Sequence, residues 1–86
     1  MRVRTIGAVA TARAEFTIEP FKDGEPGAHV LAAIEAVRAL GPEPHIGPFA
    51  TAFTGEAGVV AEAVRALTDA ALAAGATRIS ITVEHD

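Results

Sequence analysis

The chain has 86 residues, of which 50% are apolar and 5% are aromatic, and its formal net charge is −4 at pH 7. This length predicts one domain over residues 1–86 with a modest core, and the acidic balance argues against a nucleic-acid partner. No apolar run approaches the ~20 residues that insertion into a membrane requires. The sequence lacks cysteine, which excludes a disulfide framework and fits the cytoplasm, where we expect the protein to reside.

The first predicted strand covers Arg13–Glu19, where apolar and polar residues alternate, and Pro20 ends it. Its expected inner face consists of Ala14, Phe16 and Ile18. Residues 1–12 either form an N-terminal arm or lengthen this strand.

A loop composition follows over Phe21–Gly27, and Pro26 suits the first turn of the helix after it. This helix is predicted to run to about Leu40, and Gly41-Pro42 is a strong stop. Its apolar stripe consists of Val30, Ile34 and Val37.

The segment His45–Gly55, HIGPFATAFTG, predicts a tight hairpin with its turn at Gly47-Pro48. The strand after the turn covers Ala50–Thr54. We expect this hairpin strand to line the functional site, and we expect the site to bind a molecule because the segment carries no catalytic pair.

The second helix is predicted to begin after Gly55, with Glu56 in its first turn, and Gly75 closes it. Its buried stripe consists of Val60, Val64, Leu67 and Ala71. In the last predicted strand, Arg78–Glu84, apolar and polar residues alternate again. We expect Glu84-His85-Asp86 to form a frayed, solvated tail. The inward residues of this strand are Ile79, Ile81 and Val83.

The order β, α, β, β, α, β predicts an α+β, ferredoxin-like fold with a four-stranded antiparallel sheet and two helices on one face. Small side chains dominate the helical side of the expected core, which either packs closely against the sheet or leaves a ligand pocket. These helix residues are Ala32, Ala33, Ala36, Ala63, Ala70, Ala71 and Ala74.

The sequence offers no convincing catalytic or metal constellation. The one serine, Ser80, has no histidine placed beside it by spacing, and the three histidines are far apart. Glycine-rich phosphate loops are missing as well. We therefore expect neither a metal nor another cofactor.

Five polar or aromatic residues are candidates for a ligand site. The Thr51 hydroxyl should point toward the helices, where it needs a helix carbonyl, a buried water or a ligand as its partner. His29 is either a surface residue or a ligand contact. Glu19 is either solvated or a ligand contact that accepts hydrogen bonds from an amino group or offsets a cation. Phe21 and Phe49 either cover the core or stack on a flat heterocycle.

Four segments together resemble the YkoF-like family of thiamine- and hydroxymethylpyrimidine-binding proteins, over about Ala14–His85. These segments are AEFTIEPFKDG, HVLAAIEAV, GPFATAFTGEAGVVAEAV and RISITVEHD. The resemblance implies a cytoplasmic ferredoxin-like protein that forms homo-dimers or homo-tetramers through its sheets. It also implies non-enzymatic binding of thiamine or a related aminopyrimidine, in vitamin B1 salvage or transport.

By position, Thr51 matches the threonine or serine of the family's hairpin. His29 lies where many relatives have tyrosine, and Glu19 where some have an aromatic residue. An aminopyrimidine binds through flat apolar contact and a few fixed polar groups. Phe49, Phe21, Thr51 and His29 can supply these.

Two other classes of function stay open at this point. The chain is alternatively a structural or regulatory oligomerisation module without a small-molecule ligand. A third reading is a small enzyme that uses His29 or Glu19 as a general acid or base.

Overall fold

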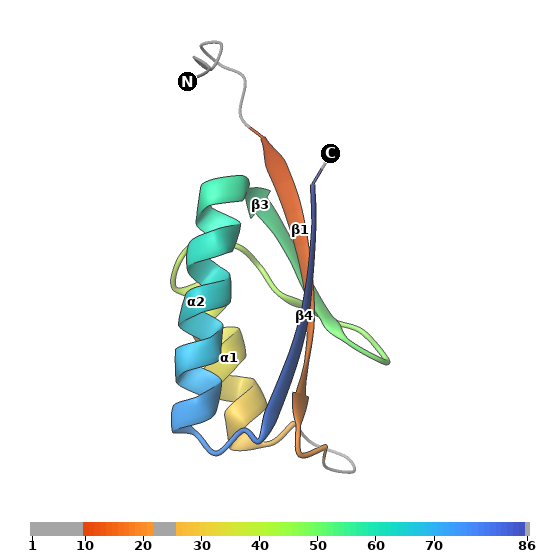
Figure 1. The fold of residues 1–86 in the computed structure, drawn as a ribbon, viewed down its shortest axis with the longest axis vertical. Helices are drawn as coiled ribbons and strands as arrows, with labels where there is room; N and C mark the ends of the chain where they lie inside the picture. The colour runs from red at the N-terminus through yellow and green to blue at the C-terminus, as the bar shows by residue number, and fades with distance from the viewer. Residues whose placement is uncertain (1–9, 22–25, 86) are drawn as a thin grey trace.

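The computed structural model describes residues 10–21 and 26–85. Its elements follow the order β1 (Thr11–Glu19), α1 (Ala28–Arg38), β2 (His45–Ile46), β3 (Thr51–Glu56), α2 (Ala57–Ala73) and β4 (Arg78–His85). Within these residues, four strands form one antiparallel sheet in the order β2-β3-β1-β4, and both helices lie on one face of it (Figure 1). The predicted ferredoxin-like fold is therefore confirmed.

Strand β1 starts earlier than the alternation alone indicated. Thr11 and Ala12 belong to it, so the end of segment 1–12 does lengthen the strand, whereas residues 1–9 lie outside the described residues. Burial alternates along the strand as predicted, because successive side chains of a strand point to opposite faces. The buried residues are Ala12, Ala14, Phe16 and Ile18.

The two neighbours of β1 pair with different lengths of it. β4 runs alongside from Ala12, opposite His85, to Glu19, opposite Arg78. β3 pairs with β1 only as far as Phe16, which lies opposite Thr51. The last part of β1, residues 17–19, therefore has a strand partner on one side only.

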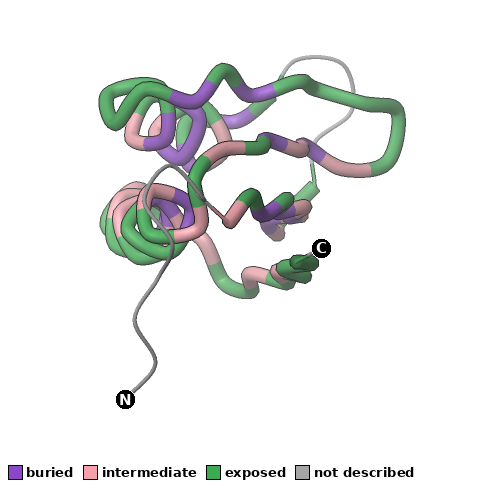
Figure 2. The backbone as a smooth tube through the Cα atoms, turned by 90° about the horizontal axis from the view of Figure 1, so that it is seen from above, coloured by how far each residue is buried: buried purple, intermediate pink, exposed green. Residues whose placement is uncertain are grey.

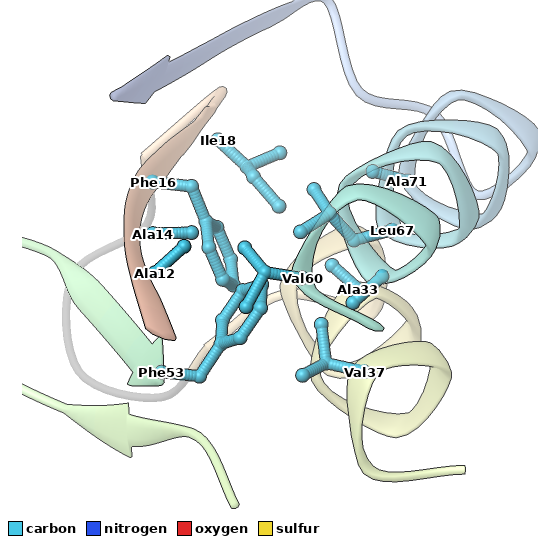
Figure 3. Packing of buried hydrophobic residues seen from close by; sticks show 11 residues of the cluster. Ala12, Ala14, Phe16, Ile18, Ala33, Val37, Phe53, Val60, Leu67 and Ala71 are labelled. Atoms are coloured by element: carbon cyan, nitrogen blue, oxygen red, sulfur yellow. The ribbon is translucent and has the colours of Figure 1, made fainter. Parts of the chain in front are cut away.

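The core lies between the helices and the inner face of the sheet, where the buried residues gather (Figure 2). Phe16 and Phe53 meet there in an edge-on arrangement, with ring centroids 6.2 Å apart (Figure 3). Val37, Val60 and Leu67 from the two helices pack against them and are fully buried.

The alanine-rich layer packs closely. Ala14 of the sheet and Ala33, Ala63 and Ala71 of the helices have no exposed surface at all. Small side chains on both sides let the helices approach the sheet, as native packing density requires. The middle of this layer thus follows the first of the two predicted outcomes, close packing.

Both helices end at a glycine, although α1 stops slightly earlier than predicted. Its last regular residue is Arg38, after which Leu40 and Gly41 donate to Val37 and Arg38 over 3.0 Å in a tightened turn. Gly41 has a φ of +114°, a conformation that favours glycine. Gly75, with a φ of +103°, follows α2 as predicted.

Three smaller expectations are wrong. Glu56 ends β3 and precedes α2, so it is outside the first helical turn, and its side chain makes no cap hydrogen bond. Val83 is 52% exposed, because β4 is an edge strand and α2 packs mainly over β1 and β3. Glu84 and His85 belong to β4 and are not a frayed tail, whereas Asp86 lies outside the described residues.

The helix stripes are also shifted from their predicted positions. Val30 and Val64 are only half-buried, and His29 and Ala63 are buried in their place. The hydrophobic pattern therefore located the buried side of each helix to within about one residue of rotation.

Candidate ligand-binding site

A cavity of about 230 Å³ opens where three segments of the chain meet. The end of β1 and the residues after it form one wall, the start of α1 forms another, and the β2–β3 turn forms the third. The lining residues are Phe16, Thr17, Ile18, Pro20, Phe21, Pro26, Gly27, Val30, Ile46, Gly47, Pro48, Phe49, Ala50 and Thr51.

None of the helix alanines lines this cavity. The pocket arises instead because β3 begins at Thr51 while β1 continues to Glu19, so the sheet has a step at this end. The alternative outcome, a pocket left by the small alanine side chains, is therefore not what forms this cavity. The step depends on strand lengths and register, which side-chain size does not reveal.

The β2–β3 turn is a tight connection in which Pro48 and Phe49 form the tip. The Gly47 amide donates to the Ala50 carbonyl over 2.9 Å, which confirms the predicted turn. A β-carbon at Gly47 would lie 2.9 Å from that same carbonyl oxygen, so this close approach requires glycine. The turn projects away from the helices and carries Phe49 with it (Figure 1).

Thr51 is the first residue of β3 and is buried, with 6% of its surface exposed. It lies on the helix-facing side of the sheet beside Phe53, as predicted. Within residues 10–21 and 26–85, its hydroxyl makes no hydrogen bond, and no fully buried side-chain oxygen or nitrogen lacks a partner. The Thr51 hydroxyl is therefore not sealed in the core but open to the cavity that Thr51 lines.

Two aromatic rings border the same cavity and are largely unpacked. Phe49 is 90% exposed and Phe21 is 71% exposed. Rings this exposed contribute little to the core, so the reading of Phe21 and Phe49 as covers of the core is wrong. They remain free to lose water against a flat, apolar partner.

His29 supports the cavity wall without lining it. Its ring is buried, with 4% of the residue exposed, so the interpretation of His29 as a surface residue is wrong. The Nε2 atom lies 2.7 Å from the carbonyl oxygen of Pro20, and since a carbonyl only accepts, Nε2 carries the proton and donates. This bond joins the first turn of α1 to the residue that follows β1.

Glu19 lies at the edge of the site and outside the lining. Its carboxylate oxygen is 3.7 Å from Nε of Arg78, the opposite residue on β4. The pair is largely exposed, so it contributes at most about 1 kcal/mol to stability.

The structure therefore brings together Thr51, Phe49 and Phe21 of the five candidate residues. Sequence reasoning missed several wall residues, above all Pro20, Pro26 and Gly27. Their positions on either side of Phe21 were visible in the sequence, but were interpreted only as a strand end and a helix start. The pocket that they help to line also includes the β2–β3 turn, which is distant from them in the sequence.

The described lining contains no ionisable side chain. Its polar side chains are the hydroxyls of Thr17 and Thr51, and the rest is aliphatic, aromatic or backbone. Among the described residues, no group of three or more His, Cys, Asp or Glu side chains is placed to hold a metal ion. This arrangement suits the binding of a small uncharged ring by apolar contact and a few hydrogen bonds.

The fold and the cavity describe a small α+β protein of the ferredoxin-like type with a pocket at one end of its sheet. The sequence profile of the thiamine-binding protein family matches residues 14–86. The chain belongs to this family, which confirms the resemblance noted from the sequence segments. No curated protein matches the chain in sequence.

Three solved structures share the fold at low sequence identity. A domain of unknown function, DUF77, from Bacillus cereus is 23% identical, with a TM-score of 0.66 over 91% of this chain and 76% of that one. A hypothetical protein from Methanocaldococcus jannaschii is 19% identical, with a TM-score of 0.64 over 88% and 78% of the two chains. A proposed thiamine biosynthesis or salvage protein from Thermotoga maritima is 22% identical, with a TM-score of 0.64 over 88% and 82%.

None of the helices in the described part of the chain has both the length and the apolar character needed to cross a bilayer.

Proposed function

We propose that this chain binds the aminopyrimidine ring of thiamine, or of its hydroxymethylpyrimidine precursor, in the cavity at the end of β1. The role is binding without catalysis, in vitamin B1 salvage or transport. Membership of the thiamine-binding protein family supports the ligand class. The structural neighbour from Thermotoga maritima, itself proposed to act in thiamine biosynthesis or salvage, supports the same pathway.

The observation that carries the proposal is the composition of the cavity wall. Two exposed aromatic rings, Phe21 and Phe49, border a pocket in which the Thr51 hydroxyl is available and charged side chains are missing from the described lining. A neutral heteroaromatic ring gains from apolar contact on its faces and from one or two hydrogen bonds at its edge. The positively charged thiazolium ring of thiamine finds no carboxylate in this described lining, so we place it toward solvent.

The volume of the cavity points to the same part of the ligand. Pockets for drug-sized molecules measure roughly 300–1,000 Å³, and this cavity holds about 230 Å³. A single substituted ring fits such a space better than the two linked rings of thiamine. We therefore expect hydroxymethylpyrimidine to retain most of the affinity of thiamine.

The absence of acid-base groups from the described lining supports binding over catalysis. His29 was one of two candidates for a general acid or base, but its Nε2 proton is engaged by the Pro20 carbonyl. Glu19 lies outside the lining. A general acid or base has to reach the substrate proton, and neither residue belongs to the described lining of the cavity.

Isothermal titration calorimetry tests the proposal with three probes: thiamine, 4-amino-5-hydroxymethyl-2-methylpyrimidine and the separate thiazole half. We expect the first two to bind and the thiazole half not to bind. The Thr51→Val variant should weaken pyrimidine binding about 3- to 10-fold, as expected for the loss of one hydrogen bond. Thr54→Val, on the same strand but on its exposed side, is the matched control and should bind normally.

Two results would contradict the proposal. Absence of heat with both pyrimidine probes at millimolar concentration would favour the ligand-free oligomerisation module. Equal weakening by Thr51→Val and Thr54→Val would mean that the loss comes from the strand as a whole and not from the cavity.

The proposal includes a cytoplasmic homo-dimer or homo-tetramer, as the family resemblance implies. Support for self-association comes from apolar side chains that the described chain leaves uncovered, including Val83 on the open edge strand and Ile46 beside the turn. Sedimentation equilibrium measures the assembly directly, and a monomer at all concentrations would remove this part of the proposal.

A further inference from the structure

The step in the sheet leaves part of the β1 backbone without a strand partner. β1 pairs with β3 up to Phe16 and with β4 up to Glu19, and neither register is interrupted. Ile18 lies beyond the start of β3 and lines the cavity. The direction of its amide and carbonyl groups therefore decides what the cavity offers to a ligand.

Two hydrogen bonds at opposite ends of β1 fix that direction. The Ala10 carbonyl accepts from the Ala57 amide over 2.8 Å, on the side of β3. The Glu19 carbonyl accepts from the Thr77 amide over 2.8 Å, on the side of β4. In an antiparallel strand the N–H and C=O of one residue point to the same side, and the side alternates from residue to residue.

Even-numbered residues of β1 therefore direct both backbone groups toward β3, and odd-numbered residues direct theirs toward β4. Ile18 is even-numbered, so its N–H and C=O face the β3 side, where β3 has not yet begun. Among the described residues, no hydrogen bond engages either group. A donor and an acceptor thus stand next to each other at the cavity wall, and backbone groups in such places need a partner.

We infer that the Ile18 backbone binds the edge of the ligand ring. The ring takes the place of the strand partner that Ile18 would have if β3 began earlier. This inference rests on the proposed function and names its specificity-determining contact. The Ile18 N–H donates to a ring nitrogen, and the Ile18 C=O accepts from the exocyclic amine beside it. A 4-aminopyrimidine carries this acceptor and this donor on adjacent atoms.

The pairing explains how a cavity with few polar side chains can select its ligand. A ring that lacks the exocyclic amine leaves the Ile18 carbonyl without its donor, and a buried polar group without a partner costs free energy. The site therefore selects amino-substituted rings over rings of the same shape without the amine. Thr51 contributes one further hydrogen bond, and the two exposed phenylalanines contribute contact area.

An amide-to-ester replacement tests this contact without changing a side chain. The chain is prepared by chemical ligation with the α-hydroxy analogue of isoleucine at position 18, which removes the Ile18 N–H donor. Position 81 provides the matched control, because Ile81 lies opposite Phe16 on β4 and directs its N–H toward the open edge of the sheet. The position 18 ester also weakens the Thr17 carbonyl as an acceptor, and the position 81 ester weakens the Ser80 carbonyl. Thr17 and Ser80 lie opposite each other on β1 and β4, so the side effect is matched.

The probe is 4-amino-5-hydroxymethyl-2-methylpyrimidine, compared with the same ring without the 4-amino group. We expect the position 18 ester to bind the probe about 3- to 10-fold more weakly than the native chain. The position 81 ester should bind it normally, and the native chain should prefer the amino ring by a similar factor. The Ile18 amide proton should also shift on binding in a ¹⁵N-resolved spectrum.

Three results would overturn the inference. If the native chain binds the probe and the position 18 ester binds it equally well, the Ile18 contact is wrong while the proposed function stands. Equal losses in both esters would trace the effect to the sheet. If the native chain fails to bind the probe at all, the proposed function fails and the inference fails with it.

Discussion

His29 and Pro20 are joined by a hydrogen bond of 2.7 Å that connects the first turn of α1 to the end of β1. The residues are nine positions apart in the chain, and the segment between them contributes Phe21, Pro26 and Gly27 to the cavity wall. The bond thus joins the end of β1 to the start of α1 beside the site. Its strength governs how firmly that wall is held.

Replacing His29 by leucine keeps an apolar side chain of moderate size at this position and removes the donor. We expect a loss of about 1 kcal/mol in the free energy of unfolding, because the Pro20 carbonyl loses its partner in a partly buried place. Urea denaturation followed by circular dichroism measures the change. His85→Gln, at an exposed position on β4, is the control and should stay within about 0.5 kcal/mol of the native chain.

A second variant at the same position, His29→Gln, separates positioning from direct ligand contact. If His29 only holds the wall, His29→Gln, whose amide can still donate to the Pro20 carbonyl, should bind the pyrimidine probe nearly as well as the native chain. A complete loss of binding in His29→Gln with stability unchanged would instead show that the imidazole touches the ligand.

Phe49→Ala should weaken pyrimidine binding with almost no effect on stability. The ring is 90% exposed in the free protein, so its removal costs the core little, whereas stacking on a bound ring contributes about 0.5–1.5 kcal/mol. Calorimetry should show affinity reduced about 3- to 10-fold. Leu72→Ala, which truncates another exposed apolar side chain on α2, away from the cavity, should leave affinity unchanged.

Gly47→Ala and Gly58→Ala should change stability in opposite directions. A β-carbon at Gly47 would lie 2.9 Å from the Ala50 carbonyl oxygen, so the turn must shift and we expect a loss of about 1 kcal/mol or more. At Gly58, in the first turn of α2, the same carbon meets nothing within 4 Å, and alanine should stabilise the helix by about 0.5–1 kcal/mol. Thermal unfolding of the two variants provides the comparison, and a gain at Gly47 would contradict the turn geometry.

Glu19→Gln should leave pyrimidine affinity within about twofold of the native value, because the Glu19 side chain lies outside the cavity lining. Its exposed ion pair with Arg78 is worth at most about 1 kcal/mol, so stability should also change little. Calorimetry and urea denaturation check both statements. A tenfold loss of affinity would restore Glu19 to the list of ligand contacts.

The fold could be predicted from the sequence because each element carries its own local signal. The alternation in β1, the Gly47-Pro48 turn and the glycines after both helices are patterns of neighbouring residues, and the structure confirms them. The inward direction of Thr51 follows from the same two-residue period. These features depend on backbone geometry over a few residues, which the types of neighbouring residues largely determine.

The remainder of the site depends on contacts between distant segments. His29 is buried because the Pro20 carbonyl lies beside it, and no local pattern around His29 reveals that acceptor. Likewise, the open backbone at Ile18 follows from the difference in length between β1 and β3. Val83 was expected inward, but the helices do not cover the edge strand fully. Each of these outcomes depends on how strands and helices are placed in the assembled fold, which neighbouring residues do not reveal.

The cavity walls come from the end of β1, the start of α1 and the β2–β3 turn, so no single segment forms a site when the chain is unfolded. A ligand that binds here binds the native state alone, and occupancy becomes linked to global unfolding. At a free ligand concentration 100 times the Kd, this linkage adds about 2.7 kcal/mol to the free energy of unfolding. For a chain of 86 residues that is a large share of the total stability, so the amount of folded protein would itself depend on the free concentration of such a ligand.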